Sequence, residues 1–331
     1  MWRLIKKLLS FLVPAVVLLA YAGLWICKFN QWDSLTFITV IPFWMWAMPG
    51  ILISVIAALL VRSRFSYVVL AIWALTALFA SAETRGLFRS AVGNRSASLS
   101  AKKSKGLIKL ISINCRSGNL QAAQEAIELK PDLVLLQEAP DREDIEELTR
   151  RLFGELGHFV AANGTAIIGK GDFLTFAEDD TTPTIHARFK HSSGVLIDLS
   201  SVKLEESIPE AEFWKLPVRE KMAANRVKNR KSLRKYIGHY RPNAGQPIRI
   251  VGGDFATPPG DDIFRPLRKA GLRDAFDNSG RGTGNTFPAK FPIFRLDQIW
   301  ISPEAQLLKT YTHRTSHSDR QIVICEFIAP L

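Results

Sequence analysis

Acidic and amide side chains stand at the ends of apolar, strand-like segments of this 331-residue chain. They are Asn114 at the end of 107–114, Glu138 at the end of 132–138, Asp254 near the end of 248–255, Asp297 within 295–302 and Asp319 directly before 320–327. One acidic residue at such a position is also typical of a turn cap. A buried cluster of carboxylates, however, repels itself unless a cation lies among the oxygens. Oxygen ligands of this kind suit Mg²⁺ or Mn²⁺, so the set predicts a divalent-cation site.

The segments that must position these side chains alternate between two periodicities. Short apolar runs predict buried strands, and runs with a helical repeat of apolar residues predict helices. The predicted strands are 107–114, 132–138, 164–170, 194–204, 248–255, 295–302 and 320–327, and the predicted helices are 120–130, 142–156, 219–240 and 261–271. This alternation favours stacked layers of sheet and helix.

Five motifs carry a resemblance to a known family. ISIN, DLVLLQE, GDF, RLDQI and SDR occur in this order within 107–328 and resemble the endonuclease/exonuclease/phosphatase superfamily. The resemblance implies an α+β fold, a four-layer DNase I-like sandwich of two β-sheets flanked by helices. It also implies hydrolysis of a phosphate ester (nucleic acid, phospholipid or a small phosphate ester) with Mg²⁺ or Mn²⁺ as cofactor. The apolar region that precedes the motifs is similar to a membrane-anchored bacterial subgroup.

The resemblance also implies a role for each polar residue at a strand end. Asn114 and Glu138 match the metal-supporting asparagine and the principal metal-binding glutamate. Asp254 matches the aspartate that orients or activates the attacking water. Asp297 matches the aspartate that orients a catalytic histidine, and Asp319 matches the aspartate beside the metal.

Several positions depart from the family pattern. Ala256 replaces a phosphate-contacting asparagine, and Arg320 replaces the catalytic histidine. Lys203 stands where a second histidine is expected, unless a shifted alignment places Ser200 there, and Gln298 replaces the last residue of RLDH. Arginine stays protonated at ordinary pH, so Arg320 is not a general base. Arg320 and Lys203 are therefore candidate phosphate-binding residues.

Two functions are compatible with this altered motif set. The first is a membrane-anchored, metal-dependent phosphoester hydrolase with an altered active site. The second is a catalytically inactive member that binds nucleic acid or phospholipid through Arg320 and Lys203. The net charge of +12 favours anionic partners, and the basic segment 219–240 adds to it or forms a solvated helix face. His317, before Asp319, is a candidate for the vacated histidine position, or an ordinary loop residue.

The N-terminal quarter of the chain contains three long uncharged runs. About 20 apolar residues span a bilayer as a helix. We therefore predict a membrane region over 1–85, with transmembrane helices at 8–27, 37–61 and 65–82. A Ser- and Lys-rich stretch follows, which predicts a flexible basic linker over 86–106. The domain that contains the motifs would then occupy 107–331.

Basic residues near the ends of these runs predict their orientation. Arg3, Lys6 and Lys7 precede the first run, and Arg62 and Arg64 separate the second from the third. Because Lys and Arg are retained on the cytoplasmic side, the N-terminus is expected inside. Three crossings then predict a multi-pass protein of the inner (cell) membrane, with its soluble domain on the periplasmic side of a bacterial envelope.

Overall fold

The chain consists of two compact units. The computed structural model describes residues 2–92, 106–178, 182–208, 212, 214–237 and 247–330. One unit, here the helical unit, comprises Met1–Thr84 and Ser207–Arg226, and the other, here the sheet unit, comprises Arg85–Glu206 and Val227–Leu331.

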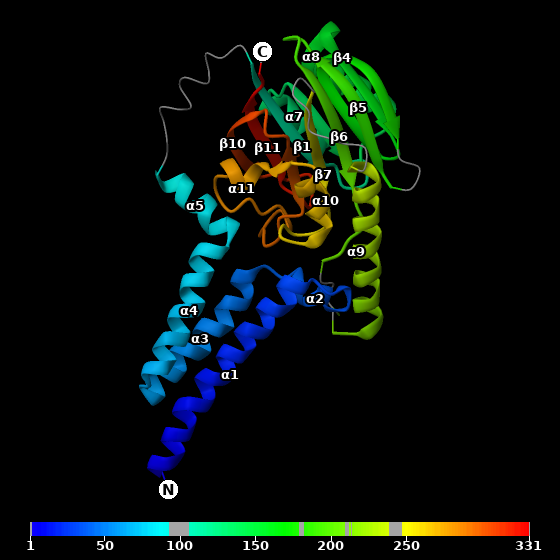
Figure 1. The fold of residues 1–331 in the computed structure, drawn as a ribbon. Coiled ribbons are helices and arrows are strands. Elements are labelled where there is room, and N and C mark those ends of the chain that lie inside the picture. The colour runs from blue at the N-terminus through cyan, green and yellow to red at the C-terminus, as the bar shows by residue number, and fades with distance from the viewer. Residues whose placement is uncertain are drawn as a thin grey trace. The chain divides into compact units, whose positions relative to one another are not determined.

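Three long helices form most of the helical unit (Figure 1): α1 (Trp2–Asn30), α3 (Phe43–Val61) and α4 (Arg64–Ala80). Their shared core contains Val17, Leu24, Ala47, Val69 and Trp73. Residue 50 is glycine for a steric reason, because a Cβ atom there would lie 2.5 Å from the Trp73 ring. Small residues of this kind let helices approach closely, which favours association in a membrane.

The predicted helix 37–61 is interrupted in the structure. It consists of the short α2 (Thr36–Thr39), which follows the turn η1 (Asp33–Leu35), and of α3. Pro42 lies between α2 and α3, where its missing N–H and its effect on the preceding residue disfavour a continuous helix.

Two helical segments in the described part of the chain are long and apolar enough to cross a membrane. They are Leu8–Asn30 and Phe43–Leu60. The segment Arg64–Phe79 qualifies only together with Glu83–Ala91, from which it is bent by 68°. The two candidate spans suggest membrane association, and a third crossing requires that the bent pair be one span.

In the described part of the sheet unit, eleven strands follow one continuous hydrogen-bonded order, β10-β11-β1-β2-β4-β5-β6-β7-β9-β8, with β3 paired to β4. The strands are β1 (Leu107–Asn114), β2 (Leu133–Gln137), β3 (Gly157–Ala162), β4 (Thr165–Glu178), β5 (Thr184–His191), β6 (Leu196–Lys203), β7 (Ile248–Asp254), β8 (Arg273–Asp274), β9 (Asp297–Ile301), β10 (Gln306–His313) and β11 (Ile322–Ile328).

Strand β4 belongs to two sheets. Its first half pairs with β2 and β3 in sheet A, which also contains β1, β10 and β11. Its second half pairs with β5 in sheet B, which continues through β6, β7, β9 and β8. The change of partner occurs at Gly171, which has a φ of 146° and where a Cβ atom would lie 2.2 Å from the Lys190 carbonyl oxygen, so this position requires glycine.

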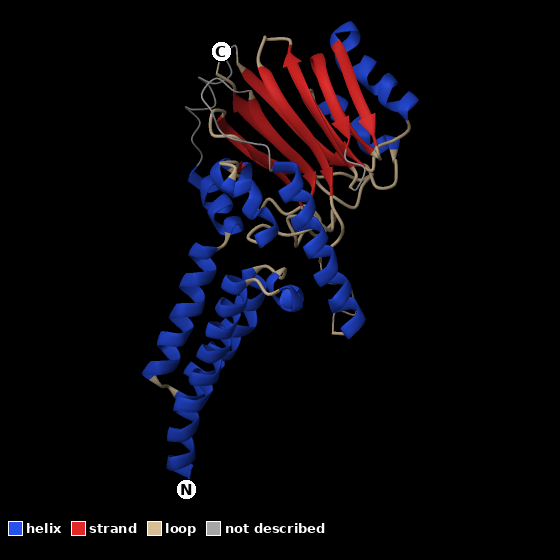
Figure 2. Ribbon diagram, turned by 45° about the vertical axis from the view of Figure 1, so that its right-hand side comes forward, coloured by secondary structure: helices blue, strands red, loops and turns tan. Residues whose placement is uncertain are grey.

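Four layers result from this arrangement (Figure 2). The inner faces of the two sheets share one core that includes Leu135, Phe189 and Ile250. On the outer side of sheet A, α7 (Leu120–Leu129) and α8 (Arg142–Phe153) pack through a second core. On the outer side of sheet B, α9 (Leu216–Ile237) and α10 (Arg265–Lys269) contribute to a third. The predicted four-layer sandwich of two sheets flanked by helices is thus confirmed.

Shorter elements complete the chain: η2 (Gly154–Leu156), η3 (Asp262–Phe264), α11 (Ala275–Ser279) and α5 (Ala82–Val92). Helix α5 includes residues 86–92, which the sequence assigns to a linker. The Arg89 side chain donates to the carbonyl oxygens of Phe276, Asp277 and Gly280 at 2.9–3.1 Å. Residues 93–105 of the predicted linker lie outside the described residues.

Helix α9 (Leu216–Ile237) corresponds to the described part of the predicted basic helix 219–240. Residues 238–246 are outside the described ranges. Three of its basic side chains pair with the chain itself: Arg226 with Gln31 and Asp33, Lys228 with Glu205, and Arg230 with Asp262. Arg226 is fully buried. These contacts leave the helix less positive charge for an external polyanion than its composition suggests.

Candidate functional site

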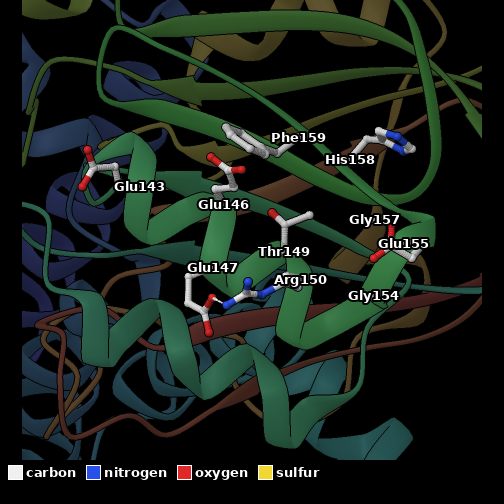
Figure 3. Close-up of a pocket in the computed structure, with 10 residues that line it drawn as sticks. All are labelled: Glu143, Glu146, Glu147, Thr149, Arg150, Gly154, Glu155, Gly157, His158 and Phe159. Atoms are coloured by element: carbon white, nitrogen blue, oxygen red, sulfur yellow. Dashed lines mark hydrogen bonds and ion pairs between the residues drawn. The ribbon is translucent and has the colours of Figure 1, made fainter.

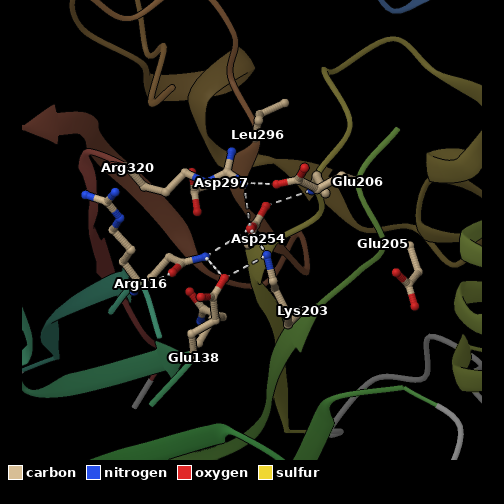
Figure 4. Close-up of polar contacts among 12 residues, drawn as sticks. Arg116, Glu138, Lys203, Glu205, Glu206, Asp254, Leu296, Asp297 and Arg320 are labelled. Atoms are coloured by element: carbon tan, nitrogen blue, oxygen red, sulfur yellow. Dashed lines mark hydrogen bonds and ion pairs between the residues drawn. The ribbon is translucent and has the colours of Figure 1, made fainter. Parts of the chain in front are cut away.

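The polar residues at the strand ends meet at one edge of the two sheets. Strands β1 and β2 are parallel, as are β6 and β7, so their carboxyl ends share this edge. Strands β9 and β11 are antiparallel to their neighbours, so their amino ends reach it as well. The residues so placed are Asn114, Glu138, Lys203, Asp254, Asp297 and Arg320, and most of them are drawn in Figure 4.

Asp254 is the centre of the cluster and is completely buried. Its Oδ2 accepts from Lys203 Nζ at 2.7 Å and from Asn114 Nδ2 at 3.0 Å, and it lies 3.2 Å from Arg320 Nη2. Its Oδ1 accepts from the backbone N–H of Ala256 at 2.8 Å. Burial alone would raise the pKa of the Asp254 carboxyl, but the positive charges of Arg320 and Lys203 hold that pKa below its usual value.

Glu138 and Asp254 share two donors, Lys203 and Asn114. Its Oε1 lies 3.0 Å from Lys203 Nζ and accepts from Asn114 Nδ2 at 3.1 Å, and its Oε2 accepts from the Ser117 N–H at 2.8 Å. In Figure 4, Lys203 and Glu138 both point toward Asp254. Burial lowers the pKa of the Lys203 ammonium, but Asp254 and Glu138 outweigh it and raise that pKa above the ordinary value. Lys203 is therefore a permanent cation.

The backbone around the cluster adopts left-handed conformations that most side chains avoid. Glu138 has a φ of 47° and Ala256 a φ of 50°, and Ser117 in the facing loop has a φ of 56°. In the GGD sequence, a Cβ atom on Gly253 would lie 2.1 Å from the Val202 carbonyl oxygen. Such conformations persist only where surrounding contacts fix them, and they are concentrated at functional sites.

Arg320 is buried against an aromatic ring. Its guanidinium carbon lies 4.5 Å from the centre of the Phe287 ring, and its Nη2 donates to Glu206 Oε1 at 3.2 Å. Its Nε and Nη1 are buried and have no hydrogen-bond partner among the described residues. Glu206 and Phe287 were not identified from the sequence. The acidic pair that follows Leu204 is the only signal that could have indicated Glu206.

Asp297 lies beside Asp254 in the β7–β9 register and is 2% exposed. Neither of its carboxylate oxygens has a hydrogen-bond partner in the described part of the chain. Burial and the neighbouring charge of Asp254 raise the pKa of the Asp297 carboxyl to about 7.

Two alternatives considered from the sequence, Ser200 and His317, do not reach the cluster. Ser200 lies within β6, where its Oγ is 3.1 Å from His186 Nδ1, so Lys203 and not Ser200 holds the site position. His317 Nδ1 lies 3.9 Å from Glu125 Oε1, away from the vacated histidine position. Asp319, the residue expected beside the metal, is half-buried. Despite burial, the negative charges of Asp254, Asp297 and Asp319 raise the pKa of the Arg320 guanidinium.

A surface pocket of about 510 Å³ lies elsewhere, along α8 and the start of β3 (Figure 3). Glu143, Glu146, Glu147 and Glu155 line it, with Arg150 paired to Glu147. None of the strand-end residues borders this pocket. Its excess of carboxylates disfavours an anionic ligand, so the strand-end cluster is the candidate site.

Comparison with known proteins adds to the motifs and the fold. A model of the endonuclease/exonuclease/phosphatase family matches residues 213–320, about a third of the chain. Over this region the chain is similar to the endonuclease/exonuclease/phosphatase superfamily. Superfamily members are phosphoester hydrolases and generally depend on a divalent metal.

Curated relatives match a short region of the chain. The uncharacterized protein YbhP of Escherichia coli K12 is 33% identical over 81 residues, which cover 22% of this chain and 31% of that protein. YbhP of Shigella flexneri matches equally. The chain therefore spans about a third of the length of these relatives.

Solved structures share the superfamily fold. Humanized D. rerio TDP2 superimposes with a TM-score of 0.51 at 18% identity, over 68% of this chain and 99% of that chain, which shows a common fold. Mannosyl-6-phosphatase Bt3783 of Bacteroides thetaiotaomicron gives a TM-score of 0.48 at 15% identity, over 67% and 99% of the two chains.

The divalent metal expected for the superfamily does not fit this donor set. All four carboxylate oxygens of Glu138 and Asp254 already accept from N–H donors or contact the Lys203 ammonium. No group of three His, Cys, Asp or Glu residues within the described ranges could hold a metal ion. An ion between the two carboxylates would have to displace a permanent cation.

Proposed function

We propose that this chain is a membrane-associated superfamily member that binds a phosphate ester without metal-dependent turnover. The observation that carries this proposal is the state of Arg320. It stands in the position of the catalytic histidine, is buried, and is ion-paired to Asp254 at 3.2 Å. Since arginine does not release a proton at ordinary pH, this position lacks a general base.

Asp254 is equally unsuited to activate a water. Two cations and two further N–H donors surround its carboxylate. Because these contacts lower its pKa, its basicity is reduced as well. Ala256 supplies only a backbone N–H, which Asp254 accepts, and no side-chain amide for a phosphate.

Phosphate binding is supported by the donors that remain. Arg320 Nε and Nη1 have no partner among the described residues, and a guanidinium binds phosphate oxygens with short, charge-assisted hydrogen bonds. Lys203 is 17% exposed and adds positive charge beside them. Nucleic acid, phospholipid and small phosphate esters all present this group.

The second candidate function is a Mg²⁺- or Mn²⁺-dependent phosphoester hydrolase with an altered active site. The contacts among Asn114, Glu138 and Asp254 favour it, because the residues that match the metal-binding and water-orienting positions are still adjacent. Asp297, Asp319 and Arg320 would be the further catalytic residues in this function.

Turnover separates the two candidates. We expect the full-length chain in detergent, with Mg²⁺ or Mn²⁺, to hydrolyse bis-p-nitrophenyl phosphate, plasmid DNA and phospholipids no faster than its Glu138→Ala variant.

A second experiment measures binding. We expect bis-p-nitrophenyl phosphate to raise the Tm of the wild type but not that of Arg320→Gln, and the exposed Arg234→Gln is the control. Metal-dependent turnover lost in Glu138→Ala would establish the hydrolase instead. If neither turnover nor a Tm response were observed, both candidate functions would be rejected.

We further propose that the helical unit is a multi-pass region of the inner membrane with three crossings. Val69 and Trp73 of α4 lie in the same core as α1 and α3, which supports a third span. With Arg3, Lys6 and Lys7 retained inside, three crossings place the sheet unit on the periplasmic side. A C-terminal alkaline phosphatase fusion should be active in cells and a matching green fluorescent protein fusion dark. The opposite pair of results would indicate an even number of crossings and a cytoplasmic sheet unit.

A further inference from the structure

We propose that the Lys203 ammonium permanently occupies the cation position of this site, so that the protein holds its paired carboxylates together without a divalent metal. This goes beyond phosphate binding, since it concerns what stabilises the site whether or not a ligand is present.

The first argument is geometric. Lys203 Nζ and Asn114 Nδ2 each contact the same two oxygens, Glu138 Oε1 and Asp254 Oδ2, at 2.7–3.1 Å. Two nitrogens and two oxygens thus alternate around a closed ring. The oxygens that face each other across this ring are those that an ion between the carboxylates would need, and both already accept from two side-chain donors.

The second argument concerns the outer oxygens. Glu138 Oε2 accepts from the Ser117 N–H, and Asp254 Oδ1 accepts from the Ala256 N–H, each at 2.8 Å. Both donors come from residues with left-handed backbone, so local conformation fixes them. Rotation of either carboxylate toward an incoming ion would therefore break a backbone hydrogen bond as well as the contact with Lys203.

The third argument is charge balance. Glu138 and Asp254 carry two negative charges, and Lys203 and Arg320 supply two positive charges within 3.2 Å of them. A divalent ion supplies the same charge. Adding such an ion to the present set would bring it close to two fixed cations, which is unfavourable in a buried site of low effective dielectric constant.

The fourth argument is that the fold itself places the ammonium. Lys203 ends β6 and pairs in register with Asp254, the end of β7. Its N–H donates to the carbonyl oxygen of Pro183 at 2.9 Å, and the next residue donates to that of Asp254. The lysine side chain therefore enters the site from a backbone position set by strand pairing.

The test measures metal binding and stability rather than activity. In the full-length chain in detergent, we expect Mn²⁺ titration to give no bound-ion signal in electron paramagnetic resonance and no change in Tm. Lys203→Met keeps the length of the side chain and removes its charge. In chelator its Tm should fall by roughly 6–20 °C, because a buried charge pair loses one partner.

Mn²⁺ should restore much of the lost Tm in Lys203→Met and give a bound-ion signal, and the double variant Lys203→Met/Glu138→Gln should show neither effect. Lys190→Met, at an exposed lysine of β5, is the matched control and should behave as the wild type. A wild-type Mn²⁺ signal that Glu138→Gln abolishes would overturn the proposal, even if Lys203→Met did not fold. An unchanged Tm of Lys203→Met in chelator would also overturn it. Neither readout depends on turnover or phosphate binding.

Discussion

Replacing Asp254 by alanine is expected to lower the free energy of unfolding by about 3–5 kcal/mol, because it leaves two buried cations without their shared counter-charge. Lys203 would keep Glu138 as a partner at 3.0 Å, whereas Arg320 would keep only the half-exposed Glu206. The Ala256 N–H and the Asn114 amide would each lose an acceptor. In a domain of this size the loss corresponds to a fall in Tm of roughly 6–20 °C.

The control for this experiment is Asp172→Ala. Asp172 is on β4, its side chain is 71% exposed, and its Oδ1 lies 3.8 Å from His158 Nδ1. Its removal should leave the Tm unchanged within about 2 °C, since exposed pairs contribute little. Comparable small losses for Asp254→Ala and Asp172→Ala would show that the cluster is not the tightly held ion-pair network described above.

The Asp297→Asn variant is expected to be more stable than the wild type at about pH 8 and equally stable only below about pH 4, where the carboxyl is protonated in both the folded and the unfolded state. The pKa of the Asp297 carboxyl is raised to about 7 in the folded protein. Between its unfolded pKa and about pH 7 the folded state therefore holds a proton that the unfolded state has released. The wild type loses stability as the pH rises through this window, and an uncharged amide does not.

The expected difference at about pH 8 is on the order of 2–4 kcal/mol, since each unit of pKa shift corresponds to about 1.4 kcal/mol. Tm measured against pH for Asp297→Asn, the wild type and Asp172→Asn would test it. The wild-type and Asp172→Asn curves should run in parallel, while Asp297→Asn diverges upward from about pH 4 and reaches its full difference above about pH 7. A constant offset of Asp297→Asn at every pH would contradict a buried carboxyl that ionises near neutrality.

The unpartnered state of Asp297 follows from the substitution at residue 320. The family resemblance gives this aspartate a histidine to orient, and here Arg320 occupies that position and pairs with Asp254 and Glu206 instead. The carboxyl of Asp297 is left buried without a hydrogen bond among the described residues.

Much of the fold, and several of the residues that lie together in the candidate site, could be predicted because the motifs are at strand ends. Asn114, Glu138 and Asp254 each follow an apolar run that could only be a buried strand. Parallel pairing then brings their carboxyl ends to one edge. The strands missed from the sequence, such as β3 and β10, have partly exposed or mixed residues and no clear alternation.

The role of Lys203 could not be predicted, because it depends on register. A shift of three residues would have placed Ser200 at the site, and only the pairing of β6 with β7 decides between them. Residue 319 lies in a loop before β11, so strand pairing does not determine where its carboxylate lies. Strand β4 takes part in both sheet A and sheet B because of the backbone conformation of Gly171, which the sequence does not reveal.

The pairing of β1 with β11 affects how the chain folds while it is being synthesised. Leu107–Ser112 of β1 pairs with Val323–Ile328 of β11, although more than 200 residues separate the two segments. The apolar strand that carries Asn114 therefore leaves the ribosome long before its partner exists. Pairings of such high contact order form slowly and leave strand edges open in the meantime. A chaperone that shields nascent chains is thus expected to associate with this region, and ribosome-bound chains stalled before residue 322 should be protease-sensitive there.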